Sequence, residues 1–288
     1  MTLRRCIEIL GPAKTPLKAP LEVLRRFMDQ DLEPDPGGGG GMRITEGVAK
    51  DRRISVEDGD MRHGRKSKSK RIDGYKRHVA TDLGSRAILA CAVTPANQPE
   101  HEALPKLKSD IDAQSIRFSE FHFDRGYMGS PTVSELAEQG VVILCKPWKA
   151  RNGDLFSKEK FDLDLRANTI TCPGGETEPI EFGKSVQFSA DACDSCPLRV
   201  KCTSAAKGSG RTVSIMEDER LQKRLRTIAK TKSGRELFRE RIPVEHSLAH
   251  IGQRQGRRAR YHSTRKNLYD LRRAASIQNL EIVQRNAA

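Results

Sequence analysis

The sequence predicts an α/β fold, and three features of the 288-residue chain indicate it. Strand-like segments alternate with helix-like segments between residues 76 and 144. Residues 150–215 contain short apolar segments separated by Gly and Pro, together with most of the cysteines, and are interpreted as a small inserted subdomain. Helical periodicity dominates from Glu217 to the end. Alternation of this kind is typical of sheets that are covered by helices.

Residues 1–41 are expected to form a separate N-terminal segment. A helix is predicted over residues 21–31, because Leu21, Leu24 and Met28 recur at helical spacing. Asp35-Pro36 and five consecutive glycines, residues 37–41, follow it. A glycine run is flexible and rarely packs, so we predict a domain boundary there.

A β-hairpin is predicted next. Residues 76–81 and 87–93 are strand-like, and Asp82-Leu83-Gly84-Ser85 between them has the composition of a turn. Residues 94–97 break the second strand. A helix is predicted near residues 100–110, although Pro105 is unfavourable inside a helix.

A strand–helix–strand unit follows. Apolar residues alternate over residues 116–123, which predicts a strand that ends at Asp124. Ser130-Pro131 has the residues preferred at the N-cap and the first position of a helix, and this helix is expected to stop at Gly140. Residues 141–144 are interpreted as a short buried strand. Two strands joined by a helix over this length are expected to pair in parallel.

The C-terminal region is predicted to be helical, with a break near residues 252–256 and a last helix from about Lys266. Leu268, Leu271 and Ala275 lie on one face of that helix. The predicted organisation is an N-terminal segment with a Gly-rich linker, a first core part, a cysteine-rich insertion and a helical second core part. Their predicted boundaries are residues 1–41, 42–149, 150–215 and 216–288.

The charge of the chain indicates a polyanionic partner. The formal net charge is +14 and the isoelectric point about 9.6. A strongly basic balance favours nucleic acid as the partner, and the alternative is a merely basic soluble protein. The mean hydropathy is −0.63 and no long apolar run is present, so no membrane partner is expected. Seven cysteines without a secretion signal indicate a reducing cytoplasm, where clustered cysteines bind metal rather than form disulfides.

Two basic segments are candidates for DNA contacts. Eight Lys or Arg residues and a single acid, Asp73, occur between residues 61 and 77, and a second group with interleaved aromatic residues covers residues 253–273. Such segments suit contacts with phosphates and bases, and the alternative for both is a solvated charged surface. The candidate DNA-binding residues are Arg65, Lys66, Lys68, Lys70, Arg71, Lys76, Arg241, Arg254, Arg257, Arg258, Arg260 and Lys266.

Two acids are candidates for catalysis or metal binding. Asp124 follows a predicted strand, and α/β sheets usually place ligand-binding groups at the carboxyl ends of their strands. Glu245 shares a helical stripe with Leu248 and Ala249, where a charge requires a site, a partner or a rim position. The simpler alternatives are a turn Asp beside Gly126 and a rim Glu paired with an arginine.

Four cysteines are candidates for a zinc site. Cys193 and Cys196 are spaced as a pair that can clamp one Zn²⁺, and Cys172 and Cys202 would complete a tetrahedral shell. The spacing from Cys196 to Cys202 is wider than in a standard zinc knuckle. Free structural thiols are therefore the alternative to zinc ligands.

Several short motifs occur in order along the chain. They are Asp51-Arg52-Arg53-Ile54-Ser55-Val56, His63-Gly64-Arg65-Lys66-Ser67, Gly74-Tyr75-Lys76-Arg77-His78-Val79-Ala80, Val93-Thr94-Pro95-Ala96-Asn97, Asp124-Arg125-Gly126-Tyr127 and Val244-Glu245-His246, with the cysteine-rich insertion between the last two. Their order and spacing resemble those of bacterial insertion-sequence DDE transposases. The resemblance covers nearly everything from about residue 45 to the end, and it implies an RNase H-like mixed sheet flanked by helices.

The resemblance implies a DNA transposase, which cleaves phosphodiesters at transposon ends and transfers the strands to a target. Three carboxylates in such a core hold Mg²⁺ or Mn²⁺, ions that prefer hard oxygen ligands. By position, Asp124 corresponds to the second acid and Glu245 to the third. The implied partner is double-stranded DNA, both transposon ends and target. The family also implies a homodimer in the bacterial cytoplasm, associated with the nucleoid.

The segment around the third acid departs from the family in two positions. The family carries a Tyr, Arg, Glu, Lys signature, which is matched here by Phe238, Arg241 and Glu245. Phe replaces Tyr, and Gly252 occupies the Lys position, with Arg254 nearby as a substitute.

The first acid of the family is expected upstream of the segment where the resemblance begins. Asp58 in a polar loop and Asp82 in a hairpin turn are the nearest substitutes, and neither has the strand context of the family. We therefore expect a truncated or decayed transposase that binds DNA but cleaves it weakly or not at all. The alternatives are a nucleic-acid-binding protein without chemistry and a zinc-stabilised structural protein.

Overall fold

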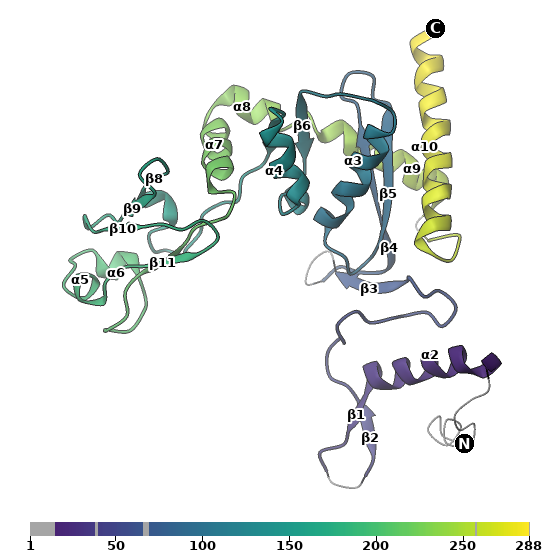
Figure 1. Ribbon diagram of the computed structural model, residues 1–288, viewed down its shortest axis with the longest axis horizontal. Coiled ribbons are helices and arrows are strands. Elements are labelled where there is room, and N and C mark those ends of the chain that lie inside the picture. The colour runs from purple at the N-terminus through teal and green to yellow at the C-terminus, as the bar shows by residue number, and fades with distance from the viewer. Residues whose placement is uncertain (1–14, 38–39, 66–68, 257, 288) are drawn as a thin grey trace. The chain divides into compact units, whose positions relative to one another are not determined.

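The computed structural model describes residues 15–37, 40–65, 69–256 and 258–287 (Figure 1). The chain consists of two compact units, Met1–Ile116 together with Pro243–Ala288, and Arg117–Ile242. The first unit therefore combines the two ends of the chain, and the second is continuous in sequence. Three candidate DNA-binding residues, Lys66, Lys68 and Arg257, lie outside the described residues.

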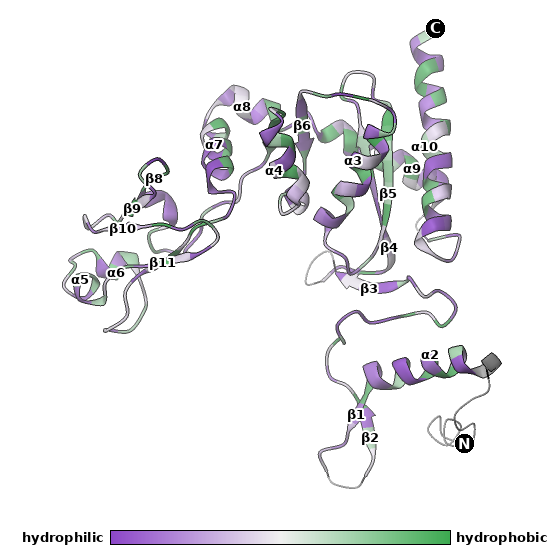
Figure 2. Ribbon diagram, viewed as in Figure 1, coloured by the Kyte–Doolittle hydropathy of each residue, from purple (hydrophilic) through white to green (hydrophobic). Residues whose placement is uncertain are grey.

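An antiparallel sheet in the order β3–β4–β5 is the framework of the first unit. Its strands are β3 (Arg62–Arg65), β4 (Arg71–Thr81) and β5 (Ile88–Pro95). β4 and β5 confirm the predicted hairpin, and Val79 lies opposite Cys91 in it. β5 is hydrophobic along most of its length (Figure 2), as expected for a strand that is covered on both faces.

Helices from two distant parts of the chain cover this hairpin (Figure 1). α3 (Leu104–Asp112) and α10 (Thr264–Ala287) both contact β5, and α9 (Ile242–Gln255) contributes to the same core. The buried residues of this core are Val79, Ile88, Cys91, Val93, Ile251, Leu271, Ala274 and Ala275. The predicted apolar face of the last helix is confirmed, because Leu268 packs on the core that contains Leu271 and Ala275.

The helix predicted near residues 100–110 begins with the 3₁₀ turn η1 (Glu100–Ala103) and continues as α3. Pro105 lies in the first turn of α3, where a backbone N–H has no partner within the helix. The proline therefore does not interrupt the helix. Asp110 of α3 pairs with Arg272 of α10 and accepts a hydrogen bond from the Cys91 backbone N–H, so it joins both helices to β5.

The N-terminal part contains α2 (Thr15–Asp31), β1 (Leu32–Pro34) and β2 (Met42–Ile44). The predicted helix is confirmed, with an earlier start. β1 and β2 pair antiparallel, with Leu32 opposite Ile44. The glycine run, where we predicted a boundary, therefore lies between two paired strands of one small sheet.

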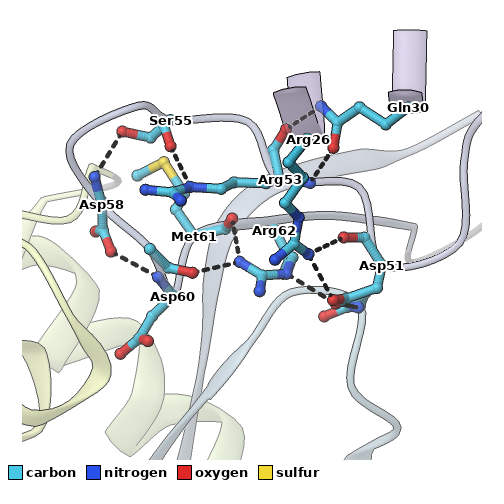
Figure 3. A network of polar contacts seen from close by, with 11 residues as sticks. Arg26, Gln30, Asp51, Arg53, Ser55, Asp58, Asp60, Met61 and Arg62 are labelled. Atoms are coloured by element: carbon cyan, nitrogen blue, oxygen red, sulfur yellow. Dashed lines mark hydrogen bonds and ion pairs between the residues drawn. The ribbon is translucent and has the colours of Figure 1, made fainter. Parts of the chain in front are cut away.

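Asp51 connects α2, the start of β3 and the segment that follows β5. Its carboxylate accepts hydrogen bonds from Arg62 at 2.7 Å and from Arg26 at 2.8 Å (Figure 3). It also accepts one from the Asn97 amide at 2.8 Å. Nearby, β3 approaches the end of β5 so closely that a Cβ on Gly64 would lie 2.0 Å from the Ala96 carbonyl oxygen. Residue 64 must therefore be glycine in this packing, and the motifs around residues 51, 64 and 97 have a structural role.

Two acids in the loop before β3 hold the start of α10. Asp58 is 2% exposed, and its Oδ2 accepts from the Tyr75 hydroxyl at 2.5 Å and the Ser263 backbone N–H at 3.2 Å. Asp60 accepts from the Thr264 backbone N–H at 2.9 Å and its hydroxyl at 2.8 Å. A carboxylate at a helix N-terminus satisfies free N–H groups and favours the helix dipole. The loop therefore fixes the helix that comes more than two hundred residues later, a separation of 205 residues for Asp58 and Ser263.

The second unit begins with the predicted strand–helix–strand unit. β6 (Glu120–Phe123), η2 (Arg125–Tyr127), α4 (Pro131–Glu138) and β7 (Val142–Cys145) follow in order, and β6 and β7 pair in parallel. The strand predicted from residue 116 starts only at Glu120, because its partner β7 has four residues to pair with it. Ser130 is at the N-cap position as predicted, but its side chain makes no capping hydrogen bond to α4.

Residues 150–215 form short helices and strands, and a cluster of buried hydrophobic residues lies among them. The elements are η3 (Lys158–Lys160), β8 (Asp162–Asp164), β9 (Thr169–Thr171), β10 (Thr177–Pro179), β11 (Ser185–Gln187), α5 (Ala190–Asp194), α6 (Arg199–Cys202) and β12 (Thr212–Ser214). They form the sheets β10–β9–β8 and β11–β12. Phe161, Ile170 and Phe188 are among the buried residues of this core.

A buried ion-pair cluster connects this region to the following helices, α7 (Glu219–Lys230) and α8 (Lys232–Leu237). Glu219 is fully buried and pairs with Lys158 and Arg226. Burial opposes ionisation of Glu219, but the hydrogen bonds from Lys158, the Met216 backbone and Arg226 outweigh it, so its pKa lies below the usual value. Glu219 is therefore a charged anchor between η3 and α7.

We predict that Asp60→Ala destabilises the first unit by about 1 kcal/mol at pH 7, because α10 loses a capping carboxylate. The hydrogen bonds from Thr264 lower the pKa of Asp60, so its contribution is present above the pKa of an unfolded aspartate and is lost as the pH falls through the folded value. The difference from wild type should therefore shrink below about pH 4. Urea denaturation followed by circular dichroism measures both effects.

Asp112→Ala is the matched control, because it removes an exposed ion pair with Lys108 and should cost no more than about 0.5 kcal/mol. Equal losses for Asp60→Ala and Asp112→Ala, or a loss at Asp60 that does not depend on pH, would contradict the capping role.

Candidate active site

Asp124 lies at the carboxyl end of β6, as the sequence predicts. β6 and β7 are parallel and end in register, with Phe123 opposite Cys145, so the residues after both strands leave from one edge. The Asp124 side chain is 60% exposed and lies immediately before η2. An exposed carboxylate at the carboxyl edge of parallel strands is positioned to meet a ligand from solvent.

Arg241 contacts this carboxylate directly. Its guanidinium forms an ion pair of 2.9 Å with Asp124, and both residues belong to the second unit. The sequence indicated Arg241 as a DNA-binding candidate, whereas in the structure it pairs with the candidate catalytic acid. A partly exposed ion pair of this kind restrains the rotamer of the aspartate more than it stabilises the fold.

Glu245 lies in the first turn of α9, in the first unit, and is exposed. Its neighbours Val244 and Leu248 pack on the core around the β4–β5 hairpin, which fixes the orientation of the helix. Asp124 and Glu245 thus belong to different units, and each is held by the packing of its own unit.

The segment around Glu245 explains the two departures from the family signature. Phe238, which occupies the position of the signature Tyr, is only 5% exposed. This side chain is therefore part of the protein interior. Arg254 pairs with Glu281, whereas the Arg77 guanidinium lies 3.6 Å from where a Cβ on Gly252 would be. The charge beside the signature Lys position therefore comes from Arg77 of β4, which sequence spacing alone did not indicate.

Neither substitute for the first acid offers a carboxylate for a metal. Asp58 is buried, and its oxygens accept hydrogen bonds from Tyr75, Ser263 and Asp60. The Asp82 side chain accepts from the backbone N–H and the hydroxyl of Ser85, and these bonds hold its pKa below the usual value. Both acids serve local structure.

The four cysteines proposed for zinc lie in one region of the second unit. A Cβ on Gly174 would lie 3.1 Å from the Cys196 sulfur and 3.5 Å from the Cys172 sulfur. Burial raises the pKa of Cys202, and the other three thiols raise it further. The Arg211 backbone N–H donates to the Cys193 sulfur at 3.4 Å. The sulfurs are therefore neighbours, and no disulfide joins them.

The other described cysteines differ from these four. Burial raises the pKa of both Cys91 and Cys145 to about 12. Each is a buried thiol in a strand, so neither is expected to ionise or to bind a metal.

Several of the basic candidates have partners within the protein, and some of these are exposed as well. Lys76 donates to the Gln98 carbonyl oxygen, and Arg260 donates to the backbone oxygens of Gln255 and Arg254. The exposed candidates among the described residues are Arg65, Lys70, Arg71, Arg254, Arg258, Arg260 and Lys266. Arg258 and Arg260, between α9 and α10, and Lys266, in the first turn of α10, are thus exposed to solvent.

Neither a preformed metal cluster nor a membrane-spanning helix occurs in the part of the chain that the structure describes. In the described ranges, no group of three or more His, Cys, Asp or Glu side chains is arranged to hold a metal ion. Among the helices described, none is long and apolar enough to cross a membrane.

The fold and the site together define a class of α/β protein. Its members have an acid at the carboxyl edge of parallel strands, and they also have a basic surface. Residues 47–280 match the family model described as a transposase DDE domain. The chain therefore belongs to the DDE transposase family of insertion sequences, and the resemblance is confirmed. Comparison with curated proteins and with solved structures finds no match.

Proposed function

We propose that this protein acts in DNA transposition of an insertion sequence, by metal-dependent cleavage and strand transfer at transposon ends. The membership of residues 47–280 in the transposase family supports the proposal most strongly. The position of Asp124 at the end of β6 agrees with it, because the carboxylate there is exposed to solvent. The substrate is double-stranded DNA, first the transposon ends and then the target.

Asp124 and Glu245 are proposed as the second and third acids of the catalytic centre. Both fit Mg²⁺ or Mn²⁺ in chemistry, since each is an exposed carboxylate and these ions prefer hard oxygen ligands. When bound, such an ion lowers the pKa of water and stabilises charge on the phosphodiester oxygens. Asp124 then serves as an oriented ligand, and Arg241 serves as the positioning residue that holds its carboxylate.

A non-catalytic nucleic-acid-binding protein is the second candidate. The engagement of Asp58 and Asp82 in local hydrogen bonds favours it, because neither acid offers a third carboxylate. We propose that the described acids support metal binding but only weak cleavage. The two candidates differ in one measurable property, the dependence of metal binding on Asp124.

The remaining features complete the proposal. The hairpin β4–β5, the β6–α4–β7 unit and the helix of Glu245 occur in the order expected for an RNase H-like core, although β3–β5 and β6–β7 are separate sheets. The proposed organisation keeps residues 42–149 and 216–288 as the core, interrupted by the cysteine-rich insertion at 150–215 and preceded by the segment 1–41. The protein is proposed to act as a homodimer at the nucleoid.

We also propose that Cys172, Cys193, Cys196 and Cys202 bind one Zn²⁺ that stabilises the insertion. Their sulfurs are neighbours, and thiolates are suitable zinc ligands. They are not already arranged as a shell within the described residues, so zinc binding would draw the side chains together. The ion would add to the small core around Phe161 and Ile170.

We predict that DNA binding by the protein falls steeply with salt. Arg258→Gln combined with Lys266→Gln should weaken binding to any duplex and make the slope of log K against log salt shallower by about 0.9 for each phosphate that is no longer neutralised. Fluorescence anisotropy with a labelled duplex at several salt concentrations measures the slope. Lys108→Gln on α3 is the control and should leave it unchanged, so equal effects would refute this assignment of the surface.

We predict that Mn²⁺ binds to the wild-type protein and that Asp124→Ala abolishes or strongly weakens the binding, because the variant lacks one of the two ligating carboxylates. Isothermal titration calorimetry measures the affinity directly. Asp82→Asn is the control, since its carboxylate is used by Ser85, and it should bind Mn²⁺ like wild type. Mn²⁺ binding that is unchanged in Asp124→Ala would exclude the catalytic assignment and favour the non-catalytic candidate.

We predict about one zinc per chain in protein purified without added metal, a value set by one four-thiolate site. Cys193→Ser should reduce the zinc content and lower the melting temperature, whereas Cys91→Ala should keep the zinc. Mass spectrometry of the metal content gives the stoichiometry. A zinc-free wild-type protein, or a melting temperature that chelators do not change, would show that the four residues are structural thiols.

A further inference from the structure

The single tryptophan of the chain follows the strand that pairs with β6, the strand that precedes the candidate catalytic acid. Trp148 follows the end of β7 by three residues, and Asp124 follows the end of β6. Because these strands are parallel and end in register, both residues leave the sheet from one edge of the second unit. The tryptophan side chain is 43% exposed.

A cation covers part of the tryptophan ring. The Arg125 guanidinium lies 5.0 Å from the ring centroid, in the range of a cation–π contact. Arg125 is itself exposed and immediately follows Asp124. The ring is therefore linked to the residue next to the acid, and part of it remains accessible to solvent.

The backbone of the tryptophan is fixed by a buried side chain. Its N–H donates to the Gln222 Oε1 at 3.1 Å, and Gln222 is fully buried in α7. The Gln222 amide in turn donates to Asp218 at 2.8 Å. A buried glutamine that holds an exposed aromatic residue preorganises the ring, so that little freedom is lost when a partner stacks on it.

The surroundings of the ring favour a nucleic acid over a protein partner. Lys146, Lys149 and Arg151 are exposed in the same segment as Trp148. Large contiguous apolar patches are a mark of protein-binding surfaces. Val142, an exposed large apolar residue of this segment, lies at the opposite end of β7.

We infer that Trp148, with Arg125, is a stacking platform for an unpaired DNA base next to the phosphodiester that Asp124 faces. Aromatic side chains bind bases by stacking regardless of sequence, and flanking arginine and lysine hold the backbone. Trp148 is thus a positioning residue that selects DNA with unpaired or distorted bases. The inference rests on the proposed DNA substrate, but it needs neither metal nor cleavage.

The experiment compares two labelled DNAs of the same sequence, a fully paired duplex and the same duplex with a short unpaired tail, in metal-free buffer. Wild type should bind the tailed DNA more tightly, and the tail should quench the tryptophan fluorescence, which comes from Trp148 alone. Trp148→Ala should lose about 5- to 150-fold in affinity for the tailed DNA by anisotropy, the range expected for one stacked base. Its affinity for the paired duplex should change little.

Two further variants separate stacking from charge and from folding. Trp148→Phe keeps an aromatic face and should retain most of the preference for the tailed DNA. Lys149→Ala should weaken both DNAs equally, because it removes a phosphate contact. Equal losses of affinity for both DNAs in Trp148→Ala would overturn the inference. So would the loss of the preference for tailed DNA in Trp148→Phe, or the absence of quenching when the tailed DNA binds to wild type. Loss of Mn²⁺ binding would overturn the catalytic proposal alone.

Discussion

The packing of the last two helices on the β4–β5 hairpin is the interaction on which the first unit depends. Val79 and Val93 of the hairpin share one buried core with Ile251 of α9 and Leu271 of α10. Burial of each such side chain contributes about 1.5–3 kcal/mol. Polar contacts at the rim then set the register, since Asp58 and Asp60 receive the backbone N–H groups that begin α10.

The environment of each acid, rather than its residue type, decides what it can do. Asp58 is enclosed, and its lone pairs are used by a phenol and by backbone N–H groups, so it is part of the architecture. Asp124 is exposed at a strand end and meets the Arg241 guanidinium of its own unit. A carboxylate in the first setting resists exchange of its partners, whereas one in the second can accept a new cation. The setting of Asp124 is therefore suited to binding a cation, whereas that of Asp58 is not.

Local sequence signals predicted the elements that depend on neighbouring residues. Periodicity indicated the β4–β5 hairpin and the β6–α4–β7 unit, and with them the position of Asp124 at a strand end. Contacts between residues far apart in the sequence could not be predicted from these local signals. Asp58 lies in a polar loop that looked solvated in sequence, but its side chain is buried against a partner, Ser263, that lies 205 residues away. In the same way, the approach of Arg77 to Gly252 depends on tertiary packing, which has no local signature.

The order of the two units along the chain has a consequence for how the protein is made. The first unit needs both residues up to Ile116 and residues from Pro243 onward, and α10 begins only at Thr264. During synthesis at about 5–20 residues per second, the hairpin therefore waits on the order of ten seconds or more for the helices that bury it. Throughout that interval β5 has one apolar face open to water, whereas the second unit can fold as soon as its sequence is complete at Ile242. The nascent chain is thus most prone to aggregate, or to be bound by a chaperone, just before its last helix leaves the ribosome.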